Sequence, residues 1–581
     1  MTKKPSKYAV PEDVKKLKPP GFPSLPCLWK AIITSNGVPH YYLYEQKRVQ
    51  DPRRPGKMKN ASGACIGKFE GGVLIMNDNW RALHPDLVMP SASADRDSCK
   101  LQYQDLQSKD YGEYAMVLKA SEDVYKRLQD HFHREDATLI YAMSVVYFVA
   151  NYVPAGYFND IFDQSILSNK WPTLPVSENS VGEFLETLGR HPAACEKYSQ
   201  SLINDGGELT AIDGHVILSC STLNDLADYG NKYKLLGGPQ VNIVQMYDVD
   251  NGRPLASSTF DGGVNDMTSV KHFFEAYTLR KKIFLVDRGF YSEPNLGMYR
   301  KNENHFIIPV PSSKIYDAAI LDLSFTKSFM YEGKDSFGNV RQDVILYKSY
   351  TVAELERKSY DYRVINEELR YAKELEKHEK GKGRKPRHRT IKPESFSAYK
   401  DDHVFVYRDE TVHAAMIKEY REKIGLEAGY TEENLQTEQD SFGVFVLRTD
   451  RKDATAEDTF LKYKKRWSIE TNYNFLKNSL DFKGLKTQDY HVMQGLSFLS
   501  VVVGQIHADY KKKKKKKSSM STYARNLSIR ESLIKAAHMK VTQHQNKHWY
   551  ISINKTKSIE LLSEMGVSVA NDLGKLDSNT Y

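Results

Sequence analysis

Cysteine is scarce and scattered in this chain, and its scarcity excludes two classes of protein. The 581 residues contain five cysteines, which form no CxxC pair and no cluster with histidine. Neither a zinc-binding module nor a disulfide-bonded secreted scaffold is therefore expected. An odd number of cysteines in a long chain fits a reducing compartment. They are Cys27, Cys65, Cys99, Cys195 and Cys220.

Long hydrophobic runs are also missing. The most apolar stretch, residues 139–153, is too short to span a bilayer and is interrupted by Asn151. The basic residues 1–7 are not followed by the apolar region of a signal peptide. We therefore expect a soluble, cytoplasmic protein with no membrane partner.

A large excess of one charge is absent too. Lys and Arg number 83 against 74 Asp and Glu, a formal charge of +9, so the distribution of charge matters more than its sum. Hydrophobic residues make up 40% of the chain and aromatic residues 11%. This content supports real cores, and the length allows two to four domains of roughly 150 residues each.

Basic residues are concentrated in a few segments. Residues 53–59 hold a cluster, including Arg53 and Arg54, between two strand-like stretches, which predicts a basic hairpin that is either solvated or in contact with phosphates. Residues 380–392 carry seven Lys or Arg and no acid. Residues 511–517 are seven consecutive lysines, for which a solvated linker is favoured over a DNA contact.

The predicted elements change character along the chain. Residues 121–203 have a helical pattern, with a capping box expected at 180–183. Three strands, a helix and a short buried strand follow, an order typical of an α/β core. These five elements are expected at 208–220, 241–247, 255–260, 266–280 and 282–286.

The second half is expected to be β-rich at first and helical later. Residues 304–450 contain strand-like runs and a charged helix near 353–379. A capping-box pattern at 455–458 begins a helix that runs to about Leu480, and an apolar helix follows at 492–506. A small tail with one strand and two short helices closes the chain.

Four polar residues share one stripe of the predicted helix at 455–480. They are spaced by 3, 4 and 7 positions, which places them within about 60° of one another. The stripe is either an exposed face held by ion pairs or part of a site. Its members are Tyr463, Arg466, Glu470 and Lys477. Three aromatic residues are expected to face a core instead: Phe460, Trp467 and Phe475.

Two aspartates join this glutamate as candidates. Asp213-Gly214 lies between two apolar runs, so it is either a hairpin turn or a carboxylate on a central strand. Asp287 ends the apolar run 283–286 and either caps the next turn or occupies the strand end where α/β sheets place ligand groups. Two carboxylates about 4 Å apart repel by about 4 kcal/mol at a dielectric near 20. Two Mg²⁺ ions would compensate this and act on a phosphodiester.

At these residues the sequence resembles the DDE transposases of prokaryotic insertion sequences. More narrowly, it resembles insertion-sequence family four, in the Tyr-Arg-Glu-Lys subgroup of large transposases. The resemblance runs from about residue 180 to 500, with further matches at 230–232, 239–240, 252–255 and 262–266. It is carried by Asp213-Gly214, Asp287-Arg288-Gly289-Phe290 and Tyr463-x2-Arg466-x3-Glu470-x6-Lys477.

The resemblance implies an α/β fold with a ribonuclease-H-like catalytic core. A largely β insertion domain would interrupt the core, and a mainly helical region would precede it. The implied domains are a DNA-end-binding region at 1–200, the core at 205–303 and 455–508, the insertion at 304–454, and a basic linker with a small tail at 509–581.

The resemblance also implies the chemistry. Asp213, Asp287 and Glu470 would bind two Mg²⁺ ions, for which Mn²⁺ would substitute. The protein would bind its element's terminal inverted repeats, hydrolyse the ends and join the 3′-hydroxyls to target DNA. Double-stranded DNA and a second copy of the chain would be its partners at the nucleoid. The expected DNA contacts are Tyr463, Arg466, Lys477, Arg288, Arg53 and Arg54.

Some alternatives stay open at this point. Certain relatives stack a flipped base on a tryptophan of the insertion, but residues 288–466 contain none, and Tyr291 could substitute. His215 is expected to be tolerated beside the site without binding metal. A non-enzymatic DNA-binding protein and a ribonuclease-H-like repair nuclease remain alternatives, although all three carboxylates are intact.

Overall fold

The computed structural model describes most of the chain, which divides into two compact units. The first unit is Met1–Gln107 with Gln543–Lys547, and the second is Ser108–Thr542 with His548–Tyr581. The described residues are 9–18, 25–33, 39–52, 54, 56–70, 73–83, 106–151, 153–219, 221, 224, 226–228, 237–263, 266–334, 339–479, 488–516, 521–544, 548–553 and 555–578.

The first unit is built on an antiparallel sheet in the order β1-β2-β3-β4. Strands β2 and β3 pair from Tyr41↔Phe69 to Gln50↔Met58 and form the predicted basic hairpin, which is confirmed. A small core of Leu43, Ile66, Met76 and Trp80 covers one face. The elements are α1 Glu12–Lys15, β1 Cys27–Ile33, β2 Pro39–Gln50, β3 Met58–Glu70, β4 Val73–Met76 and α2 Asp78–Ala82.

The second unit contains a mixed sheet whose described strands run in the order β11-β12-β13-β14-β10-β9-β6-β7-β8. Strands β6, β9 and β10 are parallel, and β7 and β8 add antiparallel on the β6 side. This arrangement of five strands is the ribonuclease-H-like core that was expected. Its strands are β6 Leu209–Leu218, β7 Gln240–Asp248, β8 Arg253–Asp261, β9 Ile283–Val286 and β10 His305–Pro309.

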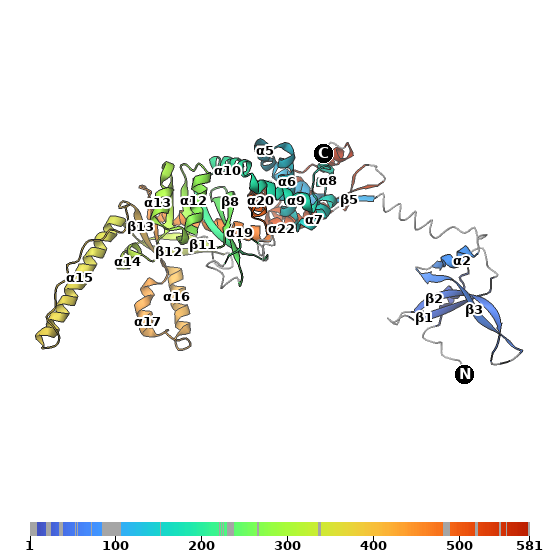
Figure 1. Ribbon diagram of the computed structural model, residues 1–581, viewed down its shortest axis with the longest axis horizontal. Helices are drawn as coiled ribbons and strands as arrows, with labels where there is room; N and C mark the ends of the chain where they lie inside the picture. The colour runs from blue at the N-terminus through green and yellow to red at the C-terminus, as the bar shows by residue number, and fades with distance from the viewer. Residues whose placement is uncertain are drawn as a thin grey trace. The chain divides into compact units, whose positions relative to one another are not determined.

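The β-rich insertion continues this sheet. Strand β14 pairs antiparallel with β10, and β13, β12 and β11 follow it outward. Helices α15, α16 and α17 extend from this part, away from the sheet (Figure 1). The elements are β11 Lys327–Lys334, β12 Val340–Thr351, α15 Val352–Glu379, β13 His403–Asp409, α16 Glu410–Lys423, α17 Glu432–Glu438, η3 Gln439–Ser441 and β14 Val444–Thr449.

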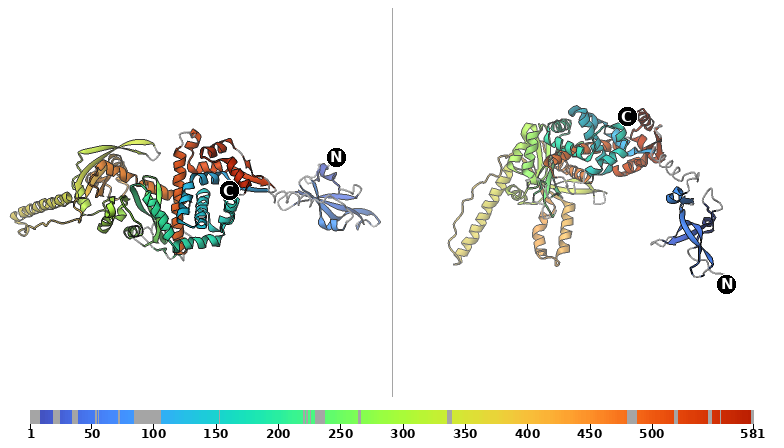
Figure 2. Two further views of the ribbon diagram at one scale, coloured as in Figure 1. Left: turned by 90° about the horizontal axis from the view of Figure 1, so that it is seen from above. Right: turned by 45° about the vertical axis from the view of Figure 1, so that its right-hand side comes forward.

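Helices cover the core strands and make most of the rest of the second unit (Figure 2). A further small sheet has the order β16-β15-β5.

Up to β6 the elements are β5 Leu106–Asp110, α4 Gly112–Ala120, α5 Glu122–His131, α6 Arg134–Ala150, α7 Ala155–Gln164, α8 Leu167–Lys170, α9 Glu178–Arg190 and α10 Ala193–Asn204. Between β8 and β11 lie α12 Asp266–Ala276, η1 Arg288–Phe290, α13 Glu293–Tyr299, η2 Lys301–Glu303 and α14 Lys314–Ile320. After β14 come α18 Ala456–Lys464, α19 Trp467–Ser479, α20 Tyr490–Lys516, α21 Thr522–Asn526, α22 Ile529–Ala536, β15 Lys540–His544, β16 Tyr550–Ile553, α23 Thr556–Glu564 and α24 Val569–Asp577.

Helix α20 is fixed against α9 at two glycines. A Cβ on Gly189 would lie 1.9 Å from the carbonyl oxygen of His491, and one on Gly495 would lie 2.2 Å from that of Leu185. Neither distance is possible for a side-chain carbon, so only glycine lets the two backbones approach this closely. Helix α20 also packs on β8 and thereby connects the helical region to the mixed sheet.

Three sequence-based expectations are wrong. The cap of α9 is Ser177, whose side chain accepts from the backbone of Ser180, so the capping box does not begin at Ser180. The helix expected at 455–480 is divided into α18 and α19. Residues 511–516 are the last turns of α20 and not a linker, because lysine is a good helix former and a packed helix propagates easily.

Among the described residues, no single helix is long and apolar enough to cross a membrane. The pair α6 and α7, bent by 89°, passes that test only when both helices are taken together.

Candidate active site

Asp213 and Asp287 lie side by side at the middle of the sheet. Strand β6 pairs with β7 on both sides of the Asp213-Gly214 step, so this step is part of a strand and the hairpin-turn interpretation is wrong. In the parallel register, Ile212 lies opposite Val286. Asp213 directly follows Ile212, and Asp287 directly follows Val286. The two carboxylates therefore leave adjacent parallel strands at the same level, which places them next to each other.

The Asp287 side chain is not used to cap the turn that follows it. Asp287 occupies the position before η1, but its carboxylate accepts no capping hydrogen bond, and the turn is closed by its backbone carbonyl. About half of the side chain, 50%, is exposed. A carboxylate that does not serve the local fold is available to a ligand.

The third carboxylate comes from the broken helix. Thr455 caps α18 with its hydroxyl, α18 ends after Lys464, and α19 begins at Trp467 with Glu470 in its first turn. The break alters the helical phase, and Trp467 is 67% exposed where a core position was expected. That expectation is wrong, because the pattern was read along one continuous helix.

Arg466 gathers the three carboxylates. Its guanidinium nitrogens lie 3.3 Å from Asp213 Oδ2, 3.4 Å from Glu470 Oε1 and 3.9 Å from Asp287 Oδ1. One side chain in the break between two helices thus contacts acids from β6, β9 and α19. The three groups selected from the sequence are brought together, and Arg466, expected as a DNA contact, lies among them.

Negative charge exceeds positive charge in this cluster. Burial raises the pKa of Asp213 to about 6, Arg466 counteracts the rise, and the Asp287 and Glu470 carboxylates add to it. Three carboxylates against one guanidinium leave a site that gains from further positive charge. Asp213 is the member whose ionisation is most costly, because it is the most buried of the three acids.

The donor set fits a hard divalent cation, although the side chains are not arranged as a metal site. Carboxylate oxygens are the ligands that Mg²⁺ prefers. In the described part of the chain, no three His, Cys, Asp or Glu side chains form a group that could hold a metal ion. The carboxylates here surround a guanidinium, so a metal ion would have to take over contacts that Arg466 now makes.

The comparisons identify the family. The family model of the transposase DDE domain matches residues 204–501, which is more than half of the chain and includes Asp213, Asp287 and Glu470. The protein belongs to the DDE transposase family. No curated protein matches the sequence. The cryo-EM structure of the piggyBac transposase synaptic complex with hairpin DNA is similar with a TM-score of 0.34 and 9% identity, over 77% of this chain and 76% of that one. Similarity at this level carries no conclusion.

This DDE transposase holds α19 against the catalytic strands with polar groups that sequence reasoning missed. The Tyr473 hydroxyl donates to the backbone carbonyl of Asp213 at 2.6 Å, and the tyrosine ring lies 5.1 Å from the ring of His215. The Asn472 amide donates to Gln245 on β7 at 3.0 Å. The only available signal was spacing, because Tyr473 lies three residues after Glu470 and therefore on its side of the helix.

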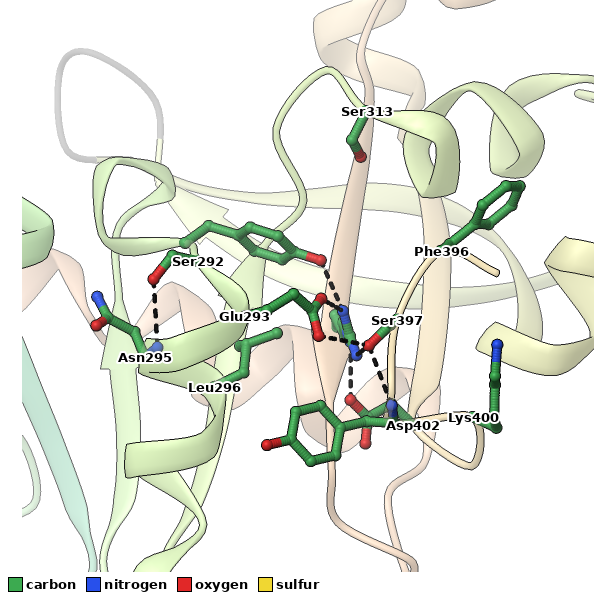
Figure 3. A network of polar contacts seen from close by, with 12 residues as sticks. Ser292, Glu293, Asn295, Leu296, Ser313, Phe396, Ser397, Lys400 and Asp402 are labelled. Atoms are coloured by element: carbon green, nitrogen blue, oxygen red, sulfur yellow. Dashed lines mark hydrogen bonds and ion pairs between the residues drawn. The ribbon is translucent and has the colours of Figure 1, made fainter. Parts of the chain in front are cut away.

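A second arginine supports the loop after Asp287. Arg448 on β14 is fully buried, and its guanidinium donates to the Tyr291 hydroxyl at 2.7 Å and to Glu293 at 3.1 Å. It also contacts Asp402 and Ser397, both at 2.8 Å. Figure 3 shows the side chains of Glu293, Ser397 and Asp402 pointing toward one another in this network. The side chain of Tyr291, considered for base stacking, is thus in a polar network.

The remaining predicted DNA contacts of the transposase are dispersed. Tyr463 is partly buried, and its ring centroid lies 5.7 Å from the Arg466 guanidinium carbon. Arg288 is exposed in η1, directly after Asp287. Arg54 is exposed in the hairpin of the other unit. Arg53 and the side chain of Lys477 lie outside the described residues, as does the matching segment 230–232.

Proposed function

We propose that the protein is an active transposase of the insertion-sequence type, similar to the Tyr-Arg-Glu-Lys subgroup of insertion-sequence family four. It binds the terminal inverted repeats of its element, hydrolyses the ends and joins the 3′-hydroxyls to target DNA. The observation that carries the proposal is the convergence of Asp213, Asp287 and Glu470 on one guanidinium.

In this proposal the three carboxylates hold two Mg²⁺ ions. Such ions would supply Lewis acidity to the attacking and leaving oxygens of the phosphodiester. The planar fork of Arg466 suits a phosphate as well as a carboxylate, so the guanidinium can contact DNA once other cations neutralise the acids. Tyr473 fixes the backbone of Asp213 and keeps its carboxylate level with Asp287.

The partners follow from the reaction. Two element ends have to be cut and joined together, so we propose a homodimer on double-stranded DNA. Location in the cytoplasm, at the nucleoid, is part of the same proposal. Light scattering with and without end DNA would measure the change in mass.

A cleavage assay on DNA carrying the element's terminal repeats tests the proposal. We expect Mg²⁺-dependent cutting by the parent, and loss of cutting in Glu470→Gln. Glu457→Gln is the matched control, because Glu457 is exposed in the first turn of the neighbouring helix α18. If Glu470→Gln cut as fast as the parent, its assignment would be wrong. Binding of the repeats without cleavage would favour a non-enzymatic protein.

A further inference from the structure

After α15 the chain turns back and runs along the helix (Figures 1 and 2). We call residues 380–392 the basic strap. Its backbone is held by side chains of α15 through hydrogen bonds of 2.8–3.2 Å, and the partners occur in reverse order along the helix, so the strap runs antiparallel to it. The pairs are Arg387 carbonyl with Arg370, Arg389 amide with Glu367, and Lys392 carbonyl with Arg363.

The strap is attached to α15 through its backbone, which leaves its charged side chains exposed to solvent. Lys380 pairs with Glu376 at the end of α15. The other six Lys or Arg side chains of the strap are exposed, and none of them has an ion-pair partner among the described residues. They are Lys382, Arg384, Lys385, Arg387, Arg389 and Lys392.

Three of the nearby acids are already engaged by other cations. Glu367, beneath the strap, accepts from Arg370, and Glu374 accepts from the same guanidinium. Glu394, just beyond the strap, pairs with Lys314 and Arg363. The six cations therefore form a fixed row of like charge, and like charges repel unless a partner supplies the opposite charge.

The dimensions suit duplex DNA. The strap follows α15 from Glu376 back to Arg363, a stretch of helix about 20 Å long at 1.5 Å per residue, and one turn of duplex is about 34–36 Å. Duplex DNA carries one phosphate charge per roughly 1.7 Å of axis. A row of six cations along such a support can face several successive phosphates.

We propose that the basic strap is a DNA-contacting surface that binds the phosphate backbone of a duplex without reading its sequence. Beyond the strap, Ser397 and Asp402 contact Arg448, which also holds Tyr291 and Glu293 after the catalytic Asp287. The chain that follows the strap is thus tied through Arg448 to the loop after Asp287, which connects the strap to the active site. The inference rests on the proposed function, because it assumes a DNA substrate.

The test removes the six cations together, each changed to Gln, in the full chain. Binding of a fluorescein-labelled duplex of arbitrary sequence is followed by anisotropy over a range of KCl concentrations. The control variant changes six cations that are paired with acids, also to Gln, so the change in charge is identical. These are Lys126, Lys271, Arg280, Lys281, Lys418 and Lys423.

Each lost phosphate contact lowers the slope of log affinity against log salt by about 0.9, so six contacts amount to about 5. We expect the strap variant to lose at least about tenfold in affinity near 100 mM KCl relative to the control variant, with a clearly smaller slope. An affinity and a slope equal to those of the control would overturn the proposal. Thermal unfolding of both variants checks folding; because the backbone bonds of the strap remain, the same melting temperature is expected.

The readout separates this inference from the proposed function. Duplex binding measures the strap, whereas Mg²⁺-dependent cleavage and Glu470→Gln measure the active site. If the ends are cut but the strap variant binds like its control, only the strap proposal fails. If the strap variant loses binding but the parent cuts nothing, only the assigned activity fails.

Discussion

Two arginines, each among acidic residues, contact the segment that begins at Asp287: Arg466 contacts Asp287 itself, and Arg448 contacts Tyr291 and Glu293. Arg448 is fully buried, and its contacts with Asp402, Tyr291, Ser397 and Glu293 measure 2.7–3.1 Å. Arg466 is 14% exposed and reaches its three carboxylates only at 3.3–3.9 Å.

The difference separates a structural ion network from a reactive one. Arg448 has short, mixed contacts with charged and neutral acceptors, which satisfy a buried guanidinium. Arg466 has three negative partners at long distances, so it is outnumbered and loosely held. Another cation can therefore take the place of the Arg466 guanidinium among its carboxylates. The Arg448 guanidinium cannot be replaced in this way without unfolding.

The largest effect is expected for Arg448→Met. Removing Arg448 takes one of two cationic partners from Asp402, which is 4% exposed and keeps Arg300 at 2.6 Å, and it leaves the rest of the buried network without its cation. Breaking a buried ion network in this way costs up to about 3–5 kcal/mol of unfolding free energy. Urea unfolding measures it. Arg280→Met removes an exposed ion pair with Glu303 and should leave the midpoint unchanged. Equal midpoints for the two variants would show that the Arg448 network is not structural.

Asp287→Asn should instead impair activity and spare the fold. Losing one carboxylate of the cluster is expected to reduce cleavage by about a hundredfold or more, since groups that stabilise transition-state charge have effects of this size. The melting temperature should stay level or rise, because repulsion is relieved. Asp453→Asn, with a 75% exposed carboxylate, is the control. If Asp287→Asn were less stable than the parent but cleaved DNA at the parental rate, the role of Asp287 would be structural and not catalytic.

A pH titration of stability sharpens the same contrast. Burial raises the pKa of Asp213 from 3.8 to about 6, so between these values the folded state binds a proton that the unfolded state has lost. The contribution of this group to stability is therefore fully present below pH 4 and falls as the pH rises to about 6. In metal-free buffer, parent stability should fall relative to Asp213→Asn by roughly 1–3 kcal/mol over that range. Parallel curves would contradict the assigned burial.

These two regions were not equally visible in the sequence. The three carboxylates were predicted because each lies in a local pattern: Asp213 and Asp287 beside apolar strands, and Glu470 in a helical stripe. The Arg448 network joins residues up to 157 positions apart in the chain, from Tyr291 to Arg448, and only the sheet brings them together. No periodicity marks a contact of that kind.

Errors in the local predictions have local physical causes. The break near Arg466 moves Trp467 to the surface, and nothing in a continuous helical pattern marks it. The terminal lysines remain helical because α20 is already packed before them, and Lys513 donates to the backbone carbonyl of Lys119. Composition predicted the exposure of Lys511, Lys512 and Lys515, but neither the partial burial of Lys513 and Lys514 nor the helical conformation.

The smallest effect is expected where the strap is attached. Arg370→Gln removes the bonds to Glu367 and to the Arg387 carbonyl, yet leaves all six strap cations in place. The strap should loosen, because a segment held mainly by side chains of one helix opens at low cost. We expect trypsin to cut within 382–392 several times faster, with a melting temperature within about 1–2 °C of the parent. Arg357→Gln, on the same helix but outside the bonds to the strap, is the control. If both variants were cut at the parental rate, the backbone bonds would not be what holds the strap, and its fixed row of cations would need another cause.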